Sequence, residues 1–158
     1  MKKIVLTLLI IASVSSCGVV RVDSYVPELT PKQVERRDLM IGVWYGDQPT
    51  KQGGRKRWVE TRRSDGTYKI EFQIVSASGE RDNSQEYGEW GVSGPVYFSI
   101  TRGSVRDGVV DIAKGTDPFT YTAYKLITLD GASIQYESFK SGNRYKVVKV
   151  SSGFTILN

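Results

Sequence analysis

The chain has 158 residues, of which 39% are apolar and 25% are charged, and it carries a net charge of +5 at pH 7. It contains no histidine and a single cysteine. This composition predicts one soluble, globular domain. The lack of histidine excludes Ser-His-Asp and Cys-His catalysis and histidine-based zinc sites. We therefore expect neither an enzyme nor a bound cofactor, and the mild charge does not indicate a nucleic acid partner.

The first 16 residues have the pattern of a secretory signal peptide. Two lysines at positions 2 and 3 precede an apolar run over residues 4–12. That run is shorter than the roughly 20 residues that a membrane-spanning helix needs, and small polar residues follow it. We interpret residues 1–16 as a cleaved signal, whose removal would lower the net side-chain charge from +5 to +3.

A lipid attachment site is predicted at Cys17. The residues Val14-Ser15-Ser16-Cys17 resemble the lipobox of bacterial lipoproteins. In that family a diacylglycerol is joined to the cysteine thiol and a peptidase cuts just before the cysteine. The resemblance implies a protein that is anchored to a membrane by acyl chains at Cys17. Gly18 implies the outer membrane, with the domain facing the periplasm, if the source has two membranes.

The segment 17–40 is expected to form a lipidated tether followed by a short helix. Pro27 lies within the tether, and Thr30-Pro31-Lys32-Gln33 has the form of a capping box with proline at the first helical position. The pattern predicts one helix from residue 31 to about residue 39.

Residues 41–158 have the pattern of an antiparallel β domain. Apolar residues alternate with polar ones over 67–76, and Asp-Gly pairs recur at 65–66, 107–108 and 130–131. Strands are predicted near 41–46, 56–63, 67–76, 86–93, 95–102, 108–112, 119–129, 132–140 and 143–150, with a short one near 154–157. We predict an all-β fold, a small up-and-down barrel of about eight strands, with a two-sheet sandwich as the alternative.

The predicted hairpin registers suggest candidate ligand-binding residues. A two-residue turn at residues 65–66 places Arg57 on the inner face beside Val59 and directs Trp58 outward. A similar turn at residues 130–131 places Lys125 inside, opposite Tyr136. Because an unpaired charge in a closed apolar core is costly, Arg57 and Lys125 must each lie at the open rim, pair with an inward acid, or meet the anionic head of an amphipathic ligand. We take Arg57, Lys125 and Tyr136 as the candidate ligand-binding residues.

The first predicted strand carries a family resemblance. Gly42-Val43-Trp44-Tyr45 resembles the Gly-x-Trp signature of lipocalins, over roughly residues 31–150. The resemblance implies an eight-stranded barrel whose floor is closed by Trp44 and whose cavity holds a small apolar ligand. A late-strand arginine usually covers this tryptophan in lipocalins. Arg144 is the nearest candidate, but its predicted register points it outward.

Two functions follow from these patterns. The first is a lipid-anchored cell-envelope protein whose barrel binds an apolar or amphipathic ligand such as a lipid or fatty acid. The alternative is a structural or protein-interaction module of the envelope that uses Trp58 as an outer contact. Ser141-Gly142-Asn143-Arg144-Tyr145 is also similar to a stretch of the membrane-bound inhibitors of C-type lysozyme, but that family's cysteine pair is absent.

Overall fold

The computed structural model describes residues 29–156. The predicted signal peptide, the lipidation site Cys17, Gly18 and most of the tether lie outside the described residues. Helix α1 (Pro31–Met40) begins with the predicted capping box, in which the Gln33 backbone N–H donates to the Thr30 hydroxyl at 3.4 Å. In return, Gln33 Oε1 accepts from the Thr30 backbone N–H at 2.8 Å. No helix within residues 29–156 has the length and apolar character to cross a membrane.

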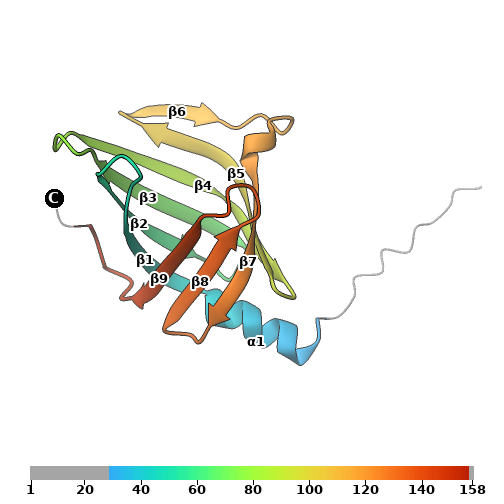
Figure 1. Cartoon of the computed structure of the whole chain (residues 1–158). Helices are drawn as coiled ribbons and strands as arrows, with labels where there is room; N and C mark the ends of the chain where they lie inside the picture. Colours follow the sequence, from blue (N-terminus) through green and yellow to red (C-terminus); the bar gives the residue numbers. More distant parts are fainter. Residues whose placement is uncertain (1–28, 157–158) are drawn as a thin grey trace, which may run out of the picture.

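Antiparallel strands form the rest of the domain. They are β1 (Gly42–Pro49), β2 (Arg55–Arg62), β3 (Thr67–Val75), β4 (Arg81–Ser93), β5 (Val96–Arg106), β6 (Val109–Ile112), β7 (Tyr121–Leu129), β8 (Ser133–Ser138) and β9 (Arg144–Val150). Pairing of β4 with β5 and of β1 with β9 closes eight strands into a barrel (Figure 1). The ninth strand, β6, pairs with the last residues of β5 and is not part of the closed barrel. The predicted all-β barrel is confirmed. Residues 154–156 are not a strand.

One end of the barrel is closed by α1, which lies across the bottom of the view in Figure 1, while β6 lies at the opposite end. Arg37 Nη2 donates to the carbonyl of Ser64 in the β2–β3 turn at 2.8 Å. The Trp44 indole N–H donates to the Met40 carbonyl at 2.8 Å, and both residues are fully buried. The helix is therefore fixed to the barrel through its last turn.

The predicted register of the β2–β3 hairpin is wrong by one residue. The loop contains three residues, because Arg63 N–H donates to the Thr67 carbonyl and Gly66 N–H to the Arg63 carbonyl. Gly66 takes the left-handed conformation, with φ at +87°, that such loops require. A one-residue shift turns every side chain of a strand to the other face. Trp58 therefore points into the barrel, where it is 3% exposed, and Arg57 points outward.

A β-bulge corrects the predicted orientation of Lys125. The pairing of β7 with β8 shifts by one residue between Leu126 and Thr128. The bulge reverses the alternation in the first half of β7. Leu126 faces inward opposite Tyr136, and Lys125 lies outside opposite Glu137.

Candidate functional site: the open end of the barrel

A cavity of about 340 Å³ lies at the end of the barrel opposite α1. Its walls are inward-facing residues of β2–β5, β7 and β8, and its rim includes β6 and the short helix η1 (Pro118–Thr120). This volume is at the lower end of the range for small-molecule sites. The charged residues that line it are all acidic: Glu60, Glu86, Asp111 and Asp117.

A layer of aromatic rings forms the base of the cavity and fills the middle of the barrel. Tyr97 stacks on Tyr124 with 5.2 Å between ring centroids, and Tyr136 stacks on Tyr145 at 5.4 Å. The Trp58 ring meets Tyr145 edge-on at 6.0 Å. Burial raises the pKa of Tyr97 and of Tyr136 well above the ordinary value, so their hydroxyls stay protonated at neutral pH. Because these rings fill the middle of the barrel, the cavity above them is shallow and has an aromatic floor.

A buried ion pair adjoins this layer. Arg62 and Glu60 are each 1% exposed and form a two-pronged contact, with Nε–Oε1 at 2.8 Å and Nη2–Oε2 at 2.6 Å. The Tyr97 hydroxyl donates to Glu60 Oε1 at 2.7 Å, and the guanidinium lies 4.4 Å above the Tyr97 ring. Burial lowers the pKa of Arg62, but the Glu60 charge, the Tyr97 and Tyr136 hydroxyls and the hydrogen bonds to Glu60 together outweigh this effect and leave the pKa raised. Arg62 therefore remains charged inside the barrel, with the Glu60 carboxylate as its partner.

One nitrogen atom of the Arg62 guanidinium has no hydrogen-bond partner among the described residues. This atom, Nη1, is buried. Glu86 lies on the cavity wall. No hydrogen bond affects its pKa. Burial raises the pKa of Glu86, and the nearby Lys56 ammonium partly offsets that rise. Lys56 Nζ lies 4.2 Å from the centroid of the Phe72 ring.

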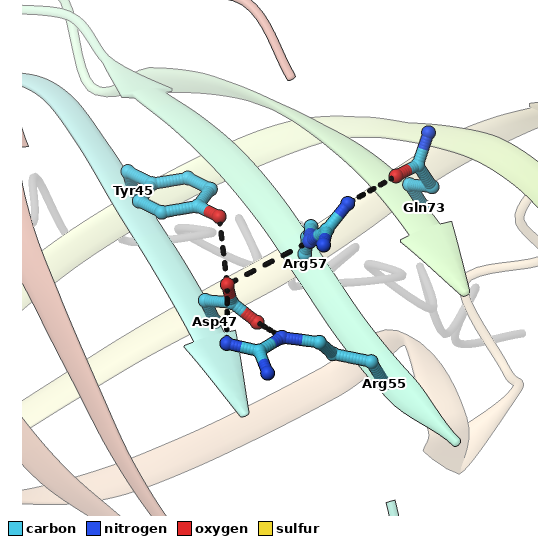
Figure 2. A network of polar contacts seen from close by, with 5 residues as sticks. All are labelled: Tyr45, Asp47, Arg55, Arg57 and Gln73. Carbon is cyan, nitrogen blue, oxygen red and sulfur yellow. Dashed lines mark hydrogen bonds and ion pairs between the residues drawn. The ribbon is translucent and has the colours of Figure 1, made fainter. Parts of the chain in front are cut away.

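Arg57 lies on the outer face of the barrel, as Figure 2 shows. Its Nη1 donates to Gln73 Oε1 at 3.2 Å, and its Nε lies 3.6 Å from Asp47 Oδ2. Asp47 also accepts from Arg55 at 2.6 Å and from the Tyr45 hydroxyl at 2.9 Å. The hydrogen bond from Arg55 is the main reason why the pKa of Asp47 is lowered. The predicted inward position of Arg57 is wrong, and its guanidinium contacts Asp47, a carboxylate that it shares with Arg55.

The remaining predicted residues divide between the two faces. Lys125 is exposed on the outside, so its predicted inward position is also wrong. Tyr136 lines the cavity and is 5% exposed. The structure brings Tyr136 together with Glu60 and Glu86, and not with Arg57 or Lys125.

Trp44 lies at the closed end, fully buried above the last turn of α1. Two cations approach its ring: Lys149 of β9, with Nζ at 5.2 Å from the ring centroid, and Arg62 of β2, with Cζ at 6.0 Å. Arg144 does not, because it points outward and its Nε contacts Glu137 at 2.7 Å. The late-strand residue that lies over the Trp44 ring is thus Lys149 and not Arg144.

Sequence reasoning missed Glu60, Arg62 and Glu86 as interior residues. A signal was present for the first two, because Trp58, Glu60 and Arg62 share one face and tryptophan favours a core position. A three-residue loop at Ser64-Asp65-Gly66 would have placed that face inside. Glu86 carries no such signal, since polar residues surround it on both sides in the sequence.

No protein-family model matches the chain, and no curated protein matches its sequence. Fold and site together define a small closed β-barrel with a shallow cavity of aromatic rings and carboxylates at its open end. Such a cavity can hold a small molecule by ring contacts at its base and by hydrogen bonds and charge at its rim.

Proposed function

We propose that the protein is a lipid-anchored protein of the cell envelope whose barrel binds one small amphipathic molecule at its open end. The observation that carries the proposal is the cavity of about 340 Å³, whose base is aromatic and whose walls are polar. A purely structural barrel of this size would be expected to fill its interior with its own side chains. The role proposed is binding, not catalysis.

The position of α1 supports a working orientation for the anchored protein. The helix begins at Pro31, only 14 residues after Cys17, and it covers the closed end of the barrel. An anchor at Cys17 would hold that end nearest the membrane. The open end would then face away from the membrane, where it can exchange small molecules with the surrounding compartment.

Native mass spectrometry of the protein purified from its own host tests the binding proposal. We expect a fraction of the protein to carry one additional small molecule, which is released when the barrel is unfolded. Protein that carries no bound molecule, and that takes none up from an extract of the host envelope, would contradict the proposal.

The anchor is tested by replacing Cys17 with serine. We expect Cys17→Ser to abolish membrane association and to leave a soluble or uncleaved form, because serine has no thiol to accept the lipid. The measurement is metabolic labelling with a radioactive fatty acid, followed by membrane fractionation. Wild-type protein that takes up no label would end the lipoprotein interpretation, whatever the behaviour of the variant.

A protein-interaction role is the second candidate, and a different surface favours it. Trp58 cannot be the outer contact, because it is buried. Large apolar side chains are instead exposed around the open end, on β6, η1, the start of β7 and the β8–β9 turn: Val109, Val110, Ile112, Phe119, Tyr121 and Phe139. Exposed apolar patches mark interaction surfaces. A photo-crosslinking residue in place of Ile112 that captures one envelope protein in living cells would support this role.

A further inference from the structure

We propose that the cavity at the open end selects a small organic cation, such as an amine with an apolar body, held between Glu86 and the rings of Tyr68 and Tyr124. The inference rests on the proposed binding function and names the class of ligand. It replaces the anionic ligand expected from the sequence, because Arg57 and Lys125 lie on the outer face.

The first argument is the sign of the charge that lines the cavity. Glu60 is neutralised by Arg62, and Lys56 lies close enough to Glu86 to influence its pKa. The carboxylates of Asp111 and Asp117 remain at the rim, and no lysine or arginine lines the cavity. Asp111 and Asp117 therefore give the mouth of the cavity a negative charge, which attracts cations. These carboxylates would repel an anion that enters the cavity.

The second argument is the state of the aromatic rings. The chain already places its own cations on three rings of this cavity: Lys56 on Phe72, Arg62 on Tyr97, and Lys140 on Phe119 with Nζ at 3.7 Å from the ring centroid. Tyr68 and Tyr124 also line the cavity, and no cation of residues 29–156 lies over either ring. The faces of aromatic rings attract a cation, and the attraction is stronger where the cation is desolvated.

The third argument is that Glu86, Tyr68 and Tyr124 line the same cavity. Burial is the main cause of the raised pKa of Tyr68, about 12, and of Tyr124, and the Glu86 charge adds to both shifts. The Tyr68 hydroxyl is paired with Thr101 at 2.9 Å, whereas no hydrogen bond contributes to the shift of Tyr124. A protonated amine in this cavity has the Glu86 carboxylate and the Tyr124 hydroxyl oxygen as possible acceptors, and its apolar body can contact the rings.

The test compares three water-soluble probes of nearly equal size: 2-phenylethylammonium, 2-phenylethanol and phenylacetate. Each is titrated by calorimetry at pH 7 into the full chain in zwitterionic lipid nanodiscs, with empty nanodiscs as the blank. We expect the ammonium compound to bind one site at least about tenfold more tightly than the alcohol, with no saturable binding of phenylacetate. Glu86→Gln should remove about tenfold of the affinity for the cation and leave the affinity for the alcohol unchanged.

Glu71→Gln is the matched control, because it removes a carboxylate from the outer face of β3, where Glu71 contacts Lys69. Glu71→Gln should leave the affinities for the ammonium compound and the alcohol unchanged. Lys56→Met is a second variant, which should strengthen binding of the cation by removing the neighbouring positive charge. If Glu86→Gln does not fold, Lys56→Met still tests the site.

Equal binding of the alcohol and the cation, or tighter binding of phenylacetate, would overturn the choice of a cation. Neither result would contradict the proposal that the cavity binds a small molecule. A cation preference that survives Glu86→Gln and does not respond to Lys56→Met would overturn the site. If no probe binds, the inference fails, and native mass spectrometry decides the proposed function separately.

Discussion

Replacing Arg62 with methionine is expected to lower the free energy of unfolding by about 3–5 kcal/mol, the range for breaking a buried ion pair by removing one partner. Methionine fills much of the space of the arginine stem but leaves the Glu60 carboxylate, which is 1% exposed in the wild-type barrel, without its cationic partner. The Tyr97 hydroxyl is then the remaining hydrogen-bond donor to that carboxylate among the described residues. Urea unfolding followed by tryptophan fluorescence measures the loss.

The double variant Glu60→Gln/Arg62→Met is the informative control. The glutamine oxygen can still accept from Tyr97, and positions 60 and 62 carry no charge in this variant. We expect the double variant to be more stable than Arg62→Met alone, since the penalty arises from the isolated carboxylate and not from lost packing. An Arg62→Met protein within about 0.5 kcal/mol of wild type would show that the pair is not desolvated in solution.

Trp44→Ala should also be strongly destabilising, by about 3–5 kcal/mol, the usual scale for deleting a buried aromatic side chain. The indole is fully buried and links β1 to the carbonyl of Met40 at the end of α1. Its loss would leave a cavity and also release the helix from the closed end. Near-ultraviolet circular dichroism during urea unfolding gives the midpoint.

Two further substitutions separate the contributions of Trp44. Trp44→Phe keeps an aromatic ring but removes the hydrogen bond to Met40, so its cost should be smaller than that of Trp44→Ala. Phe119→Ala removes an aromatic residue that is 72% exposed and should change stability by about 0.5 kcal/mol at most. A midpoint for Trp44→Ala equal to that of Phe119→Ala would mean that Trp44 is not part of the core.

Most of the fold could be predicted from the sequence because its signals are local. The capping box at Thr30 fixed the start of α1, and the Asp-Gly turns separated the strands. Closure of the barrel followed from the number of short strands in one chain of this size. The Gly-x-Trp motif pointed to the end where Trp44 lies, and the structure shows how α1 closes that end.

The inner face was harder to predict, because orientation in a strand depends on single residues. One extra residue in the loop before Thr67 reversed β2 against β3, and one bulge near Ile127 reversed half of β7. Neither feature has a sequence signal as strong as an Asp-Gly turn. The charged residues assigned to the interior were consequently the wrong ones, and the true interior acid Glu86 was not considered.

The most direct test of the cavity is the chemical reactivity of a cysteine placed inside it. Thr122 lines the cavity, whereas Ile134 is fully buried in the core. The chain has one cysteine of its own, at position 17, so the wild-type protein is the blank. The variants Thr122→Cys and Ile134→Cys are treated with a small methanethiosulfonate reagent that carries an ammonium group, and the rate of modification is followed by mass spectrometry.

An open, ligand-sized cavity predicts that Thr122→Cys reacts at least about a hundredfold faster than Ile134→Cys, because reaction of a fully buried thiol requires the barrel to open first. The bound molecule recovered from the host should slow the reaction of Thr122→Cys when it is added back. Equal, slow modification of the two variants in correctly folded protein would show that the interior is closed, and would contradict a binding role for this end of the barrel.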